Sequence, residues 1–254
     1  MKSRHCFVLA VSLSWMLNAL AMPPNPAQLD WVALDGFEIA RTETTVAQFG
    51  RFVEATQMKT TAERDGGGHV YEAGWVRQAG WTWHTPLGRG QKHELWPAVH
   101  VTFEEAQMFC RWAGGQLPND AQWVKAAYTE MRLTPPAPFE RGRTYPYPTG
   151  ASPQGAQCLG ECGADRSQPH RTPLSHGIGP ALAGHTQAGV NGLLDMGGNV
   201  WEWVDEPQGQ SREKRTRGGS WWYGASPMRA EHLASKDAAF AAVYIGFRCV
   251  RAAR

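Results

Sequence analysis

The chain has 254 residues, of which 42% are hydrophobic, 11% aromatic and 19% charged, and its formal net charge is +2. This composition excludes an intrinsically disordered protein, and the small net charge argues against nucleic acid or an anionic membrane as the main partner. The 12 Trp, 28 Gly and 17 Pro residues indicate turn-rich structure rather than a helical bundle.

The N-terminus has the pattern of a secretory signal. Lys2 and Arg4 precede an apolar run over residues 7–17, and Ala19-Leu20-Ala21 follows as a small-x-small cleavage site. The alternative is a membrane anchor, but the run is short for a bilayer. We therefore predict that residues 1–21 are a cleaved signal peptide and that the mature protein is soluble, periplasmic or secreted, without membrane contact.

Residues 22–254 show no internal repeat and no linker-like change of composition, so we expect a single domain and a monomer. Residues 31–41 predict a strand and a turn. Thr44 or Thr45 then caps a helix with an apolar face, and residues 57–97 predict a long loop region without helical period. The apolar residues of that helix are Val46, Phe49, Phe52 and Val53.

The second half of the chain predicts two more helices and then strands. Thr102 and Glu105 form a capping box that opens one helix, and Asn119 caps the next. A long stretch rich in Pro and Gly follows. Residues 216–222 and 243–249 then predict strands, the second with apolar residues alternating on one face. Few helices, short strands and much loop indicate an α+β domain.

Four cysteines remain when Cys6, inside the signal, is set aside. Because export allows disulfides, a local pair of Cys158 with Cys162 would leave Cys110 with Cys249, although the sequence by itself allows three pairings. A zinc site of four thiolates is the alternative, but the usual Cys-x-x-Cys spacing is missing.

Three segments carry a family resemblance. They are residues 96–123, with Trp96-Pro-Ala-Val-His-Val-Thr-Phe103; residues 191–203, ending in Gly198-Asn-Val-Trp-Glu-Trp203; and Arg217-Gly-Gly-Ser-Trp221 with the distant Gly246-Phe-Arg-Cys249. Together with residues 37–56 they resemble the formylglycine-generating enzyme (sulfatase-modifying factor) family over nearly all of the mature chain.

The resemblance implies a fold and two disulfides. The fold is a variant of the C-type lectin fold with few helices, short strands and long loops, which agrees with the α+β pattern of the sequence. Members commonly join the cysteine of the first conserved helix to that of Gly-Phe-Arg-Cys, which here implies Cys110–Cys249. A short element of bacterial members, in which two cysteines lie close together, likewise implies Cys158–Cys162.

The resemblance also implies structural calcium at the Gly-Asn-Val-Trp-Glu-Trp turn. The ligands carried over are Asp195, the carbonyls of Gly198 and Val200, and the Glu202 carboxylate, and calcium prefers such oxygen ligands. The alternative is that Glu202 is a hydrogen-bonded core carboxylate. A second calcium site of the family falls near residues 157–175, where we assign no ligands.

The sequence departs from the family at the catalytic strand. Catalytic members carry two cysteines, separated by four residues, that bind copper(I) and oxidise a target cysteine to formylglycine. The corresponding positions here are Tyr223 and Met228. Thiolate pairs select copper(I), and a phenol with a thioether does not replace them. The resemblance therefore carries over the fold but not this oxidase activity, and copper is not expected.

We expect a maturation or accessory factor that binds a peptide or small metabolite in a cleft, with an unusual oxidation left open. The candidate cleft residues are Ser220, Tyr223, Met228, His232 and Trp201. One alternative is a non-catalytic lectin-like binding or structural module. Another is an enzyme with a rebuilt metal site that uses Met228 and His232 as ligands.

Overall fold

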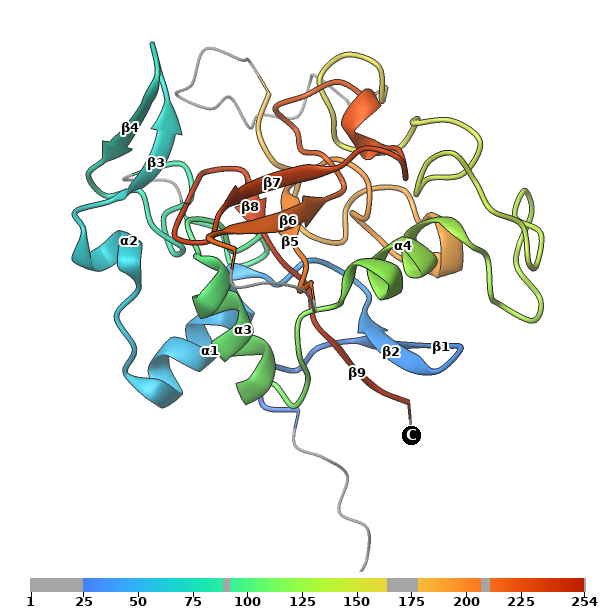
Figure 1. The fold of residues 1–254 in the computed structure, drawn as a ribbon, viewed down its shortest axis with the longest axis horizontal. Coiled ribbons are helices and arrows are strands. Elements are labelled where there is room, and N and C mark those ends of the chain that lie inside the picture. The colour runs from blue at the N-terminus through green and yellow to red at the C-terminus, as the bar shows by residue number, and fades with distance from the viewer. Residues whose placement is uncertain (1–24, 89–91, 164–177, 207–210, 254) are drawn as a thin grey trace, which may run out of the picture.

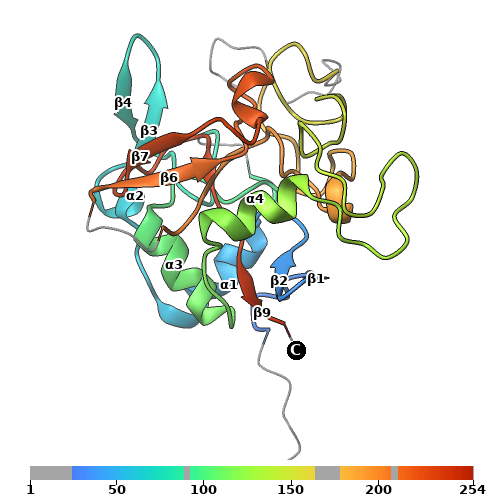
Figure 2. The same ribbon diagram turned by 45° about the vertical axis from the view of Figure 1, so that its right-hand side comes forward.

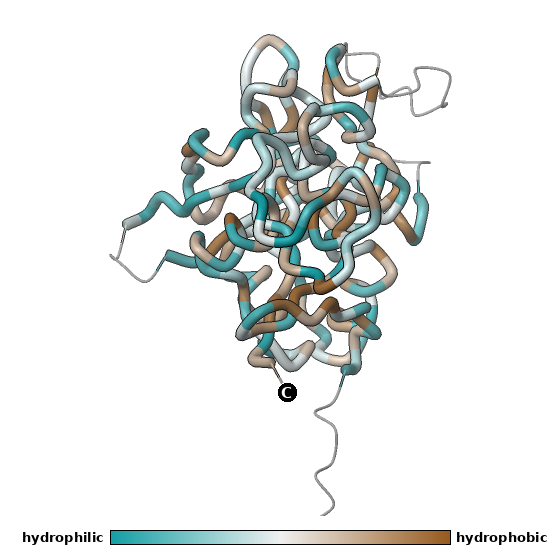
Figure 3. Tube along the Cα trace, turned by 90° about the vertical axis from the view of Figure 1, so that its right-hand side faces the viewer, coloured by the Kyte–Doolittle hydropathy of each residue, from teal (hydrophilic) through white to brown (hydrophobic). Residues whose placement is uncertain are grey.

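The structure is a computed structural model that describes residues 25–88, 92–163, 178–206 and 211–253 (Figure 1). The predicted signal peptide therefore lies outside the described residues. In the part that is described, no helix is long and apolar enough to cross a membrane. Hydrophilic stretches run along the outer loops, and the more hydrophobic stretches gather toward the interior (Figure 3).

A three-stranded antiparallel sheet joins the two ends of the described chain. Its order is β1 (Trp31–Leu34), β2 (Phe37–Ala40) and β9 (Val250–Ala252). Ile39 of β2 faces Val250 of β9, and both side chains are fully buried. The predicted strand and turn over residues 31–41 are therefore a hairpin.

The three predicted helices form and begin at their predicted caps. They are α1 (Val46–Thr56), α3 (Phe103–Trp112) and α4 (Asp120–Tyr128). The N-caps Thr45, Thr102 and Asn119 each complete a capping box, which satisfies two otherwise unpaired N–H groups per helix. Helices α1 and α3 then pack through aromatic rings: the centroids of Phe49 and Phe109 lie 5.7 Å apart.

A four-stranded sheet forms the other half of the molecule. Its order is β7 (Ala234–Asp237), β6 (Glu213–Arg217), β5 (Trp201–Trp203) and β8 (Ile245–Gly246). Figure 2 shows α3 and α4 beneath β6 and β7. Most of the buried apolar residues form one cluster between this sheet and the α1–α3 pair.

Residues 57–97 contain regular structure that the sequence did not predict. Helix α2 (Thr61–Arg64) is followed by a hairpin of β3 (Gly68–Tyr71) and β4 (Trp75–Gln78), which projects at one edge of the molecule (Figure 1). Each element has four residues, which is too short to show a period. Gly68 is needed here because a Cβ atom would lie 2.0 Å from Nδ1 of His100.

The C-terminal strand prediction was wrong in its extent. Strand β6 ends at Arg217 because Gly218 and Gly219 take positive φ values of 93° and 76°. Only Ile245 and Gly246 of the predicted strand 243–249 pair in the sheet. The expected alternation also fails, because residues 241–250 are all buried.

Both expected disulfides are present. Cys110 in α3 pairs with Cys249, and Cys158 pairs with Cys162. The first joins the middle of the chain to its last strand, and the second closes a five-residue loop over residues 158–162. The four-thiolate zinc alternative therefore does not apply to these cysteines.

Candidate functional site

A cluster of aromatic and basic side chains surrounds Trp201 in β5. Its indole is 2% exposed, and its ring centroid lies 5.9 Å from that of Tyr223 and 5.8 Å from that of His232. The ammonium nitrogen of Lys236 lies 5.3 Å from the same indole centroid. Trp201 lies on β5 and Lys236 on β7, so this contact reaches across β6, the strand between them.

Aromatic rings continue from Trp201 to the β3–β4 hairpin. Tyr244 lies 5.8 Å from Tyr223 and 5.3 Å from Trp75, measured between ring centroids. Tyr71 and Trp75 on the hairpin are 43% and 39% exposed, and Trp222 and Tyr223 are half-buried. We call Tyr71, Trp75, Trp222 and Tyr223 the aromatic surface; buried Tyr244 and Trp201 lie beneath it.

The structure brings together three of the five candidate cleft residues, Trp201, Tyr223 and His232. The other two, Ser220 and Met228, are 1% and 0% exposed. Met228 belongs to a separate small cluster around the Cys158–Cys162 disulfide, with its sulfur 3.7 Å from that of Cys162. The two positions that match the family's cysteine pair therefore have different surroundings.

The disulfide loop 158–162 holds the segment that carries these two positions. Leu159 N–H donates to the Tyr223 carbonyl at 2.8 Å, and Ala225 N–H donates to the Glu161 carboxylate at 2.7 Å. Met228 then packs against Cys162. The loop thus fixes residues 223–228 from both ends.

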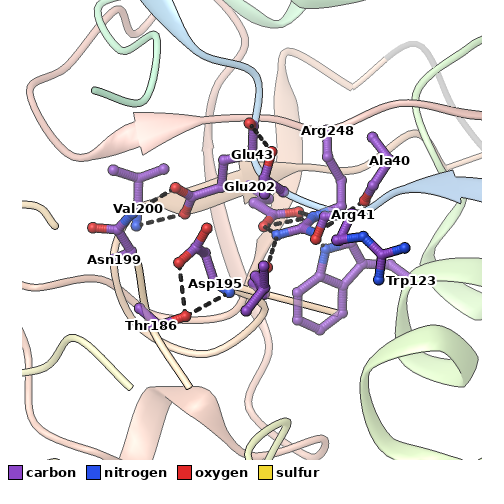
Figure 4. Close-up of polar contacts among 12 residues, drawn as sticks. Ala40, Arg41, Glu43, Trp123, Thr186, Asp195, Asn199, Val200, Glu202 and Arg248 are labelled. Carbon is purple, nitrogen blue, oxygen red and sulfur yellow. Dashed lines mark hydrogen bonds and ion pairs between the residues drawn. The ribbon is translucent and has the colours of Figure 1, made fainter. Parts of the chain in front are cut away.

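The predicted calcium turn is built around an ion pair between Glu202 and Arg248, both fully buried (Figure 4). Nε and Nη2 of Arg248 donate to the Glu202 carboxylate at 2.7–2.9 Å. Trp123 Nε1 donates to the same carboxylate at 2.7 Å. Arg248 also donates to the carbonyls of Ala40, Arg41 and Leu194.

Two more buried carboxylates lie near this pair. Asp195 accepts from Gly184 N–H and the Thr186 hydroxyl, and Glu43 accepts from Asn199 Nδ2 and Val200 N–H. Burial raises the pKa of Glu43 well above its ordinary value, and the negative charges of Asp195 and Glu202 add to this. Burial also raises the pKa of Asp195.

The charge of these residues suits a calcium ion, but only some of their oxygen atoms are free to bind one. Three carboxyl groups face a single guanidinium, so a cation could replace the protons that the raised pKa values of Glu43 and Asp195 favour. However, Glu202 already accepts from Arg248 and Trp123, so an ion would have to share this carboxylate. Within the described ranges, no group of three or more His, Cys, Asp or Glu side chains is arranged to hold a metal ion. Calcium at this turn stays a prediction.

Sequence reasoning did not find several residues of these two sites. Lys236 and the hairpin aromatics had no motif around them, and Glu43 lies more than 150 positions from the turn it contacts. Arg248 was visible only as part of Gly246-Phe-Arg-Cys249, with no role assigned to it. A contact with a distant part of the chain leaves no pattern among the residues next to it in the sequence.

Taken together, few helices, three small sheets and long loops pinned by disulfides and buried ion pairs define a C-type-lectin-like α+β fold. The chain belongs to the family of the sulfatase-modifying factor enzyme 1-like domain, whose profile matches residues 19–253. The expected family and fold are confirmed.

Its curated relatives include active and inactive proteins. The chain is 30% identical over 199 residues to the formylglycine-generating enzyme of Streptomyces coelicolor, which covers 69% of this chain and 59% of that enzyme. It is 27% identical over 266 residues to the inactive C-alpha-formylglycine-generating enzyme 2 of Mus musculus, covering 87% and 77% of the two chains. It is also 29% identical over 221 residues to the hercynine oxygenase of Mycolicibacterium thermoresistibile, covering 79% and 42%.

Solved structures show the same fold at low identity. PvdO from Pseudomonas aeruginosa matches with a TM-score of 0.60 and 19% identity, over 85% of this chain and 80% of that one. CarF matches with a TM-score of 0.58 and 19% identity, over 90% of this chain and all (100%) of that one. These likenesses concern the fold alone.

Proposed function

We propose that this chain is an exported maturation or accessory factor that binds a peptide or a small metabolite at the aromatic surface. We propose further that it does not perform the copper-dependent oxidation of cysteine to formylglycine. The observation that supports the second part is the state of the cysteines: every cysteine in the described ranges is in a disulfide. No thiolate among those residues is free to bind copper(I).

The replacements at the two family cysteine positions point the same way. Met228 is fully buried against the disulfide loop 158–162, and the Tyr223 hydroxyl lies 3.5 Å from that of Tyr244. A thioether buried in an apolar cluster and a phenol in an aromatic one do not form a pair of soft anionic ligands. The presence of a protein named as inactive among the relatives is consistent with this loss.

The aromatic surface supports the binding role. Large exposed aromatic side chains are uncommon on a soluble domain, and rings that present one apolar face and a polar edge are frequent in ligand sites. Tyr71 and Trp75 are exposed on the β3–β4 hairpin, and the Tyr71 ring lies 6.3 Å from that of the half-buried Trp222, which precedes the half-buried Tyr223. No observation in the described residues favours the lectin-like alternative.

The oxidase part is tested with a sulfatase-type cysteine peptide, copper and oxygen. We expect no conversion of cysteine to formylglycine by the purified protein, as followed by the mass of the peptide. The Streptomyces coelicolor enzyme, assayed in parallel, is the positive control. Conversion of the peptide by this chain would show that the proposal is wrong and that the cysteine pair is dispensable.

The binding part is tested on protein isolated from the export compartment. Native mass spectrometry of the wild type is expected to show a retained small molecule or peptide that is lost from Trp75→Ala. Val76→Ala is the matched control, since Val76 is its neighbour on β4 and equally exposed, at 40% against 39%. Equal retention by both variants would place the ligand elsewhere.

A further inference from the structure

Among the described residues, the side chains of Trp201 and His232 have no hydrogen-bond partner, and that of Lys236 has only a backbone carbonyl. The Trp201 Nε1–H group is buried and has no hydrogen-bond partner among the described residues. Lys236, which lies over the indole, has no carboxylate within ion-pair distance in that part of the chain, and its ammonium donates only to the neighbouring Ser235 carbonyl. The His232 imidazole likewise makes no hydrogen bond to the described residues.

The negatively charged side chains nearest to this cluster do not neutralise its positive charge. Glu231 is engaged by Arg229 at 2.6 Å, and Glu213 lies on the exposed end of β6. Burial lowers the pKa of Lys236, and Glu213 opposes this only in part. Burial, with the positive charges of Lys236 and Arg217, also lowers the pKa of His232. No side chain of the described residues therefore supplies a full counter-charge to Lys236 and His232, and a bound anion would raise the pKa of both.

The Lys236 and His232 side chains reach solvent, and the Trp201 indole lies beneath them. Lys236 and His232 are half-buried, whereas Trp201 is 2% exposed. Tyr223 lies next to Trp201 and belongs to the aromatic surface. A ligand on that surface would have its ring over Tyr223 and a polar group within reach of Lys236.

We propose that Trp201, His232 and Lys236 form a binding site for the carboxylate of a ligand whose aromatic or apolar part lies on the aromatic surface. This inference rests on the proposed binding function and names the chemistry of its ligand. The carboxylate could belong to a small aromatic acid or to the C-terminus of a peptide. Both sources present the same ring and carboxylate, and only the peptide carries a further backbone.

Lys214 provides a matched control. It stands directly opposite Lys236 on β6, and its ammonium also lies over an aromatic ring, 5.1 Å from the centroid of Phe103. It has no contact with Trp201 among the contacts of the described residues. A general loss of positive charge from the sheet would therefore affect both variants, whereas loss of the carboxylate site affects only Lys236→Met.

The experiment measures dissociation constants of phenylacetate and of its neutral analogue phenylacetamide by tryptophan fluorescence of the full chain. For the wild type and for Lys214→Met, we expect phenylacetate to bind at least about tenfold more tightly than the amide, as a charge-assisted hydrogen bond would give. For Lys236→Met, we expect the two probes to bind alike, and Lys236→Arg should restore the preference. Far-ultraviolet circular dichroism checks that the variants fold.

The tripeptide Gly-Gly-Phe and its C-terminal amide form the second arm. Tighter binding of the free peptide acid than of phenylacetate would assign the site to a peptide terminus, and the reverse order would assign it to a small acid. Equal binding of acids and amides to the wild type would overturn the carboxylate site while leaving the aromatic surface as a binding site. Failure of all four probes to bind would count against both.

Discussion

Arg248 shows how one side chain connects four distant parts of the chain. It is fully buried, and each of its N–H groups has an acceptor: the Glu202 carboxylate and the carbonyls of Ala40, Arg41 and Leu194. A guanidinium has five donors in a fixed planar geometry, so few sites can satisfy it completely. The residue therefore holds β2, the turn before β5 and the last strands in one arrangement.

Removing this guanidinium is expected to be costly. Arg248→Met should lower the free energy of unfolding by about 3–5 kcal/mol, because it leaves the Glu202 carboxylate buried without its counter-ion. Urea denaturation measures the change. The control is Arg143→Met, which breaks the exposed pair with Glu140 and should change stability by less than about 1 kcal/mol. Equal effects of the two variants would contradict this account.

His100 is expected to make stability sensitive to mild acid. Burial lowers its pKa to about 4 from 6.5, although hydrogen bonds to the carbonyls of Pro86 and Ala241 oppose the shift. The unfolded chain therefore takes up this proton first as the pH falls from about 6.5 to 4, and stability is lost over that range by up to about 3 kcal/mol.

The variant His100→Gln isolates this titration. Glutamine keeps a side-chain N–H that can donate to the Pro86 carbonyl, as His100 Nε2 does at 3.0 Å. We expect the free energy of unfolding of the variant to change less between pH 7 and pH 5 than that of the wild type, measured by denaturant titration at each pH. An unchanged slope would mean that other groups dominate the acid response.

The elements that the sequence predicted are those with a local cause. The capping boxes at Thr45, Thr102 and Asn119 consist of residues that are close in sequence. These few residues indicate both that a helix forms and where it begins. The β3–β4 hairpin has no such cause, because its position depends on contacts with Trp222, Phe240 and Tyr244 far along the chain. The end of β6 was missed because Gly218 and Gly219 were treated as strand residues.

The two disulfides are expected to contribute unequally to stability. Cys110–Cys249 spans 139 positions and Cys158–Cys162 spans 4, and the entropy removed from the unfolded chain grows with the closed loop. The double variant Cys110→Ser/Cys249→Ser should lose about 5 kcal/mol and Cys158→Ser/Cys162→Ser about 2 kcal/mol. Denaturant unfolding of the two variants measures both values, and a reversed order would refute the argument.

At the scale of the whole molecule, the sequence predicted the family, the fold class and both disulfides, but it predicted the site only in part. Trp201, Tyr223 and His232, which the sequence analysis named as candidate cleft residues, lie together. Their meeting point also includes Lys236, which comes from a strand that the sequence did not predict. Long-range packing chooses such neighbours, and one sequence contains no direct record of it.

Calcium binding remains a prediction that concerns the whole domain. If an ion binds near Asp195 and Glu202, it stabilises only the folded state, so calcium should raise the melting temperature and a chelator should lower it. The effect should be absent in Asp195→Asn, which keeps the shape of the side chain but removes its charge. A wild-type melting curve that is the same in calcium and in chelator would mean that Arg248 alone provides the positive charge there.

The pairing of β2 with β9 has a consequence for the order of folding events. Ala40 N–H donates to the Cys249 carbonyl and Thr44 N–H to that of Phe247, so the first sheet contacts residues about 200 positions later. Such non-local contacts slow folding, because the entropy of closing a long loop is lost before the contacts stabilise the chain. A nascent chain that lacks residues 245–252 cannot complete this sheet or close Cys110–Cys249. The first sheet and the long disulfide therefore form only when nearly all of the chain is available.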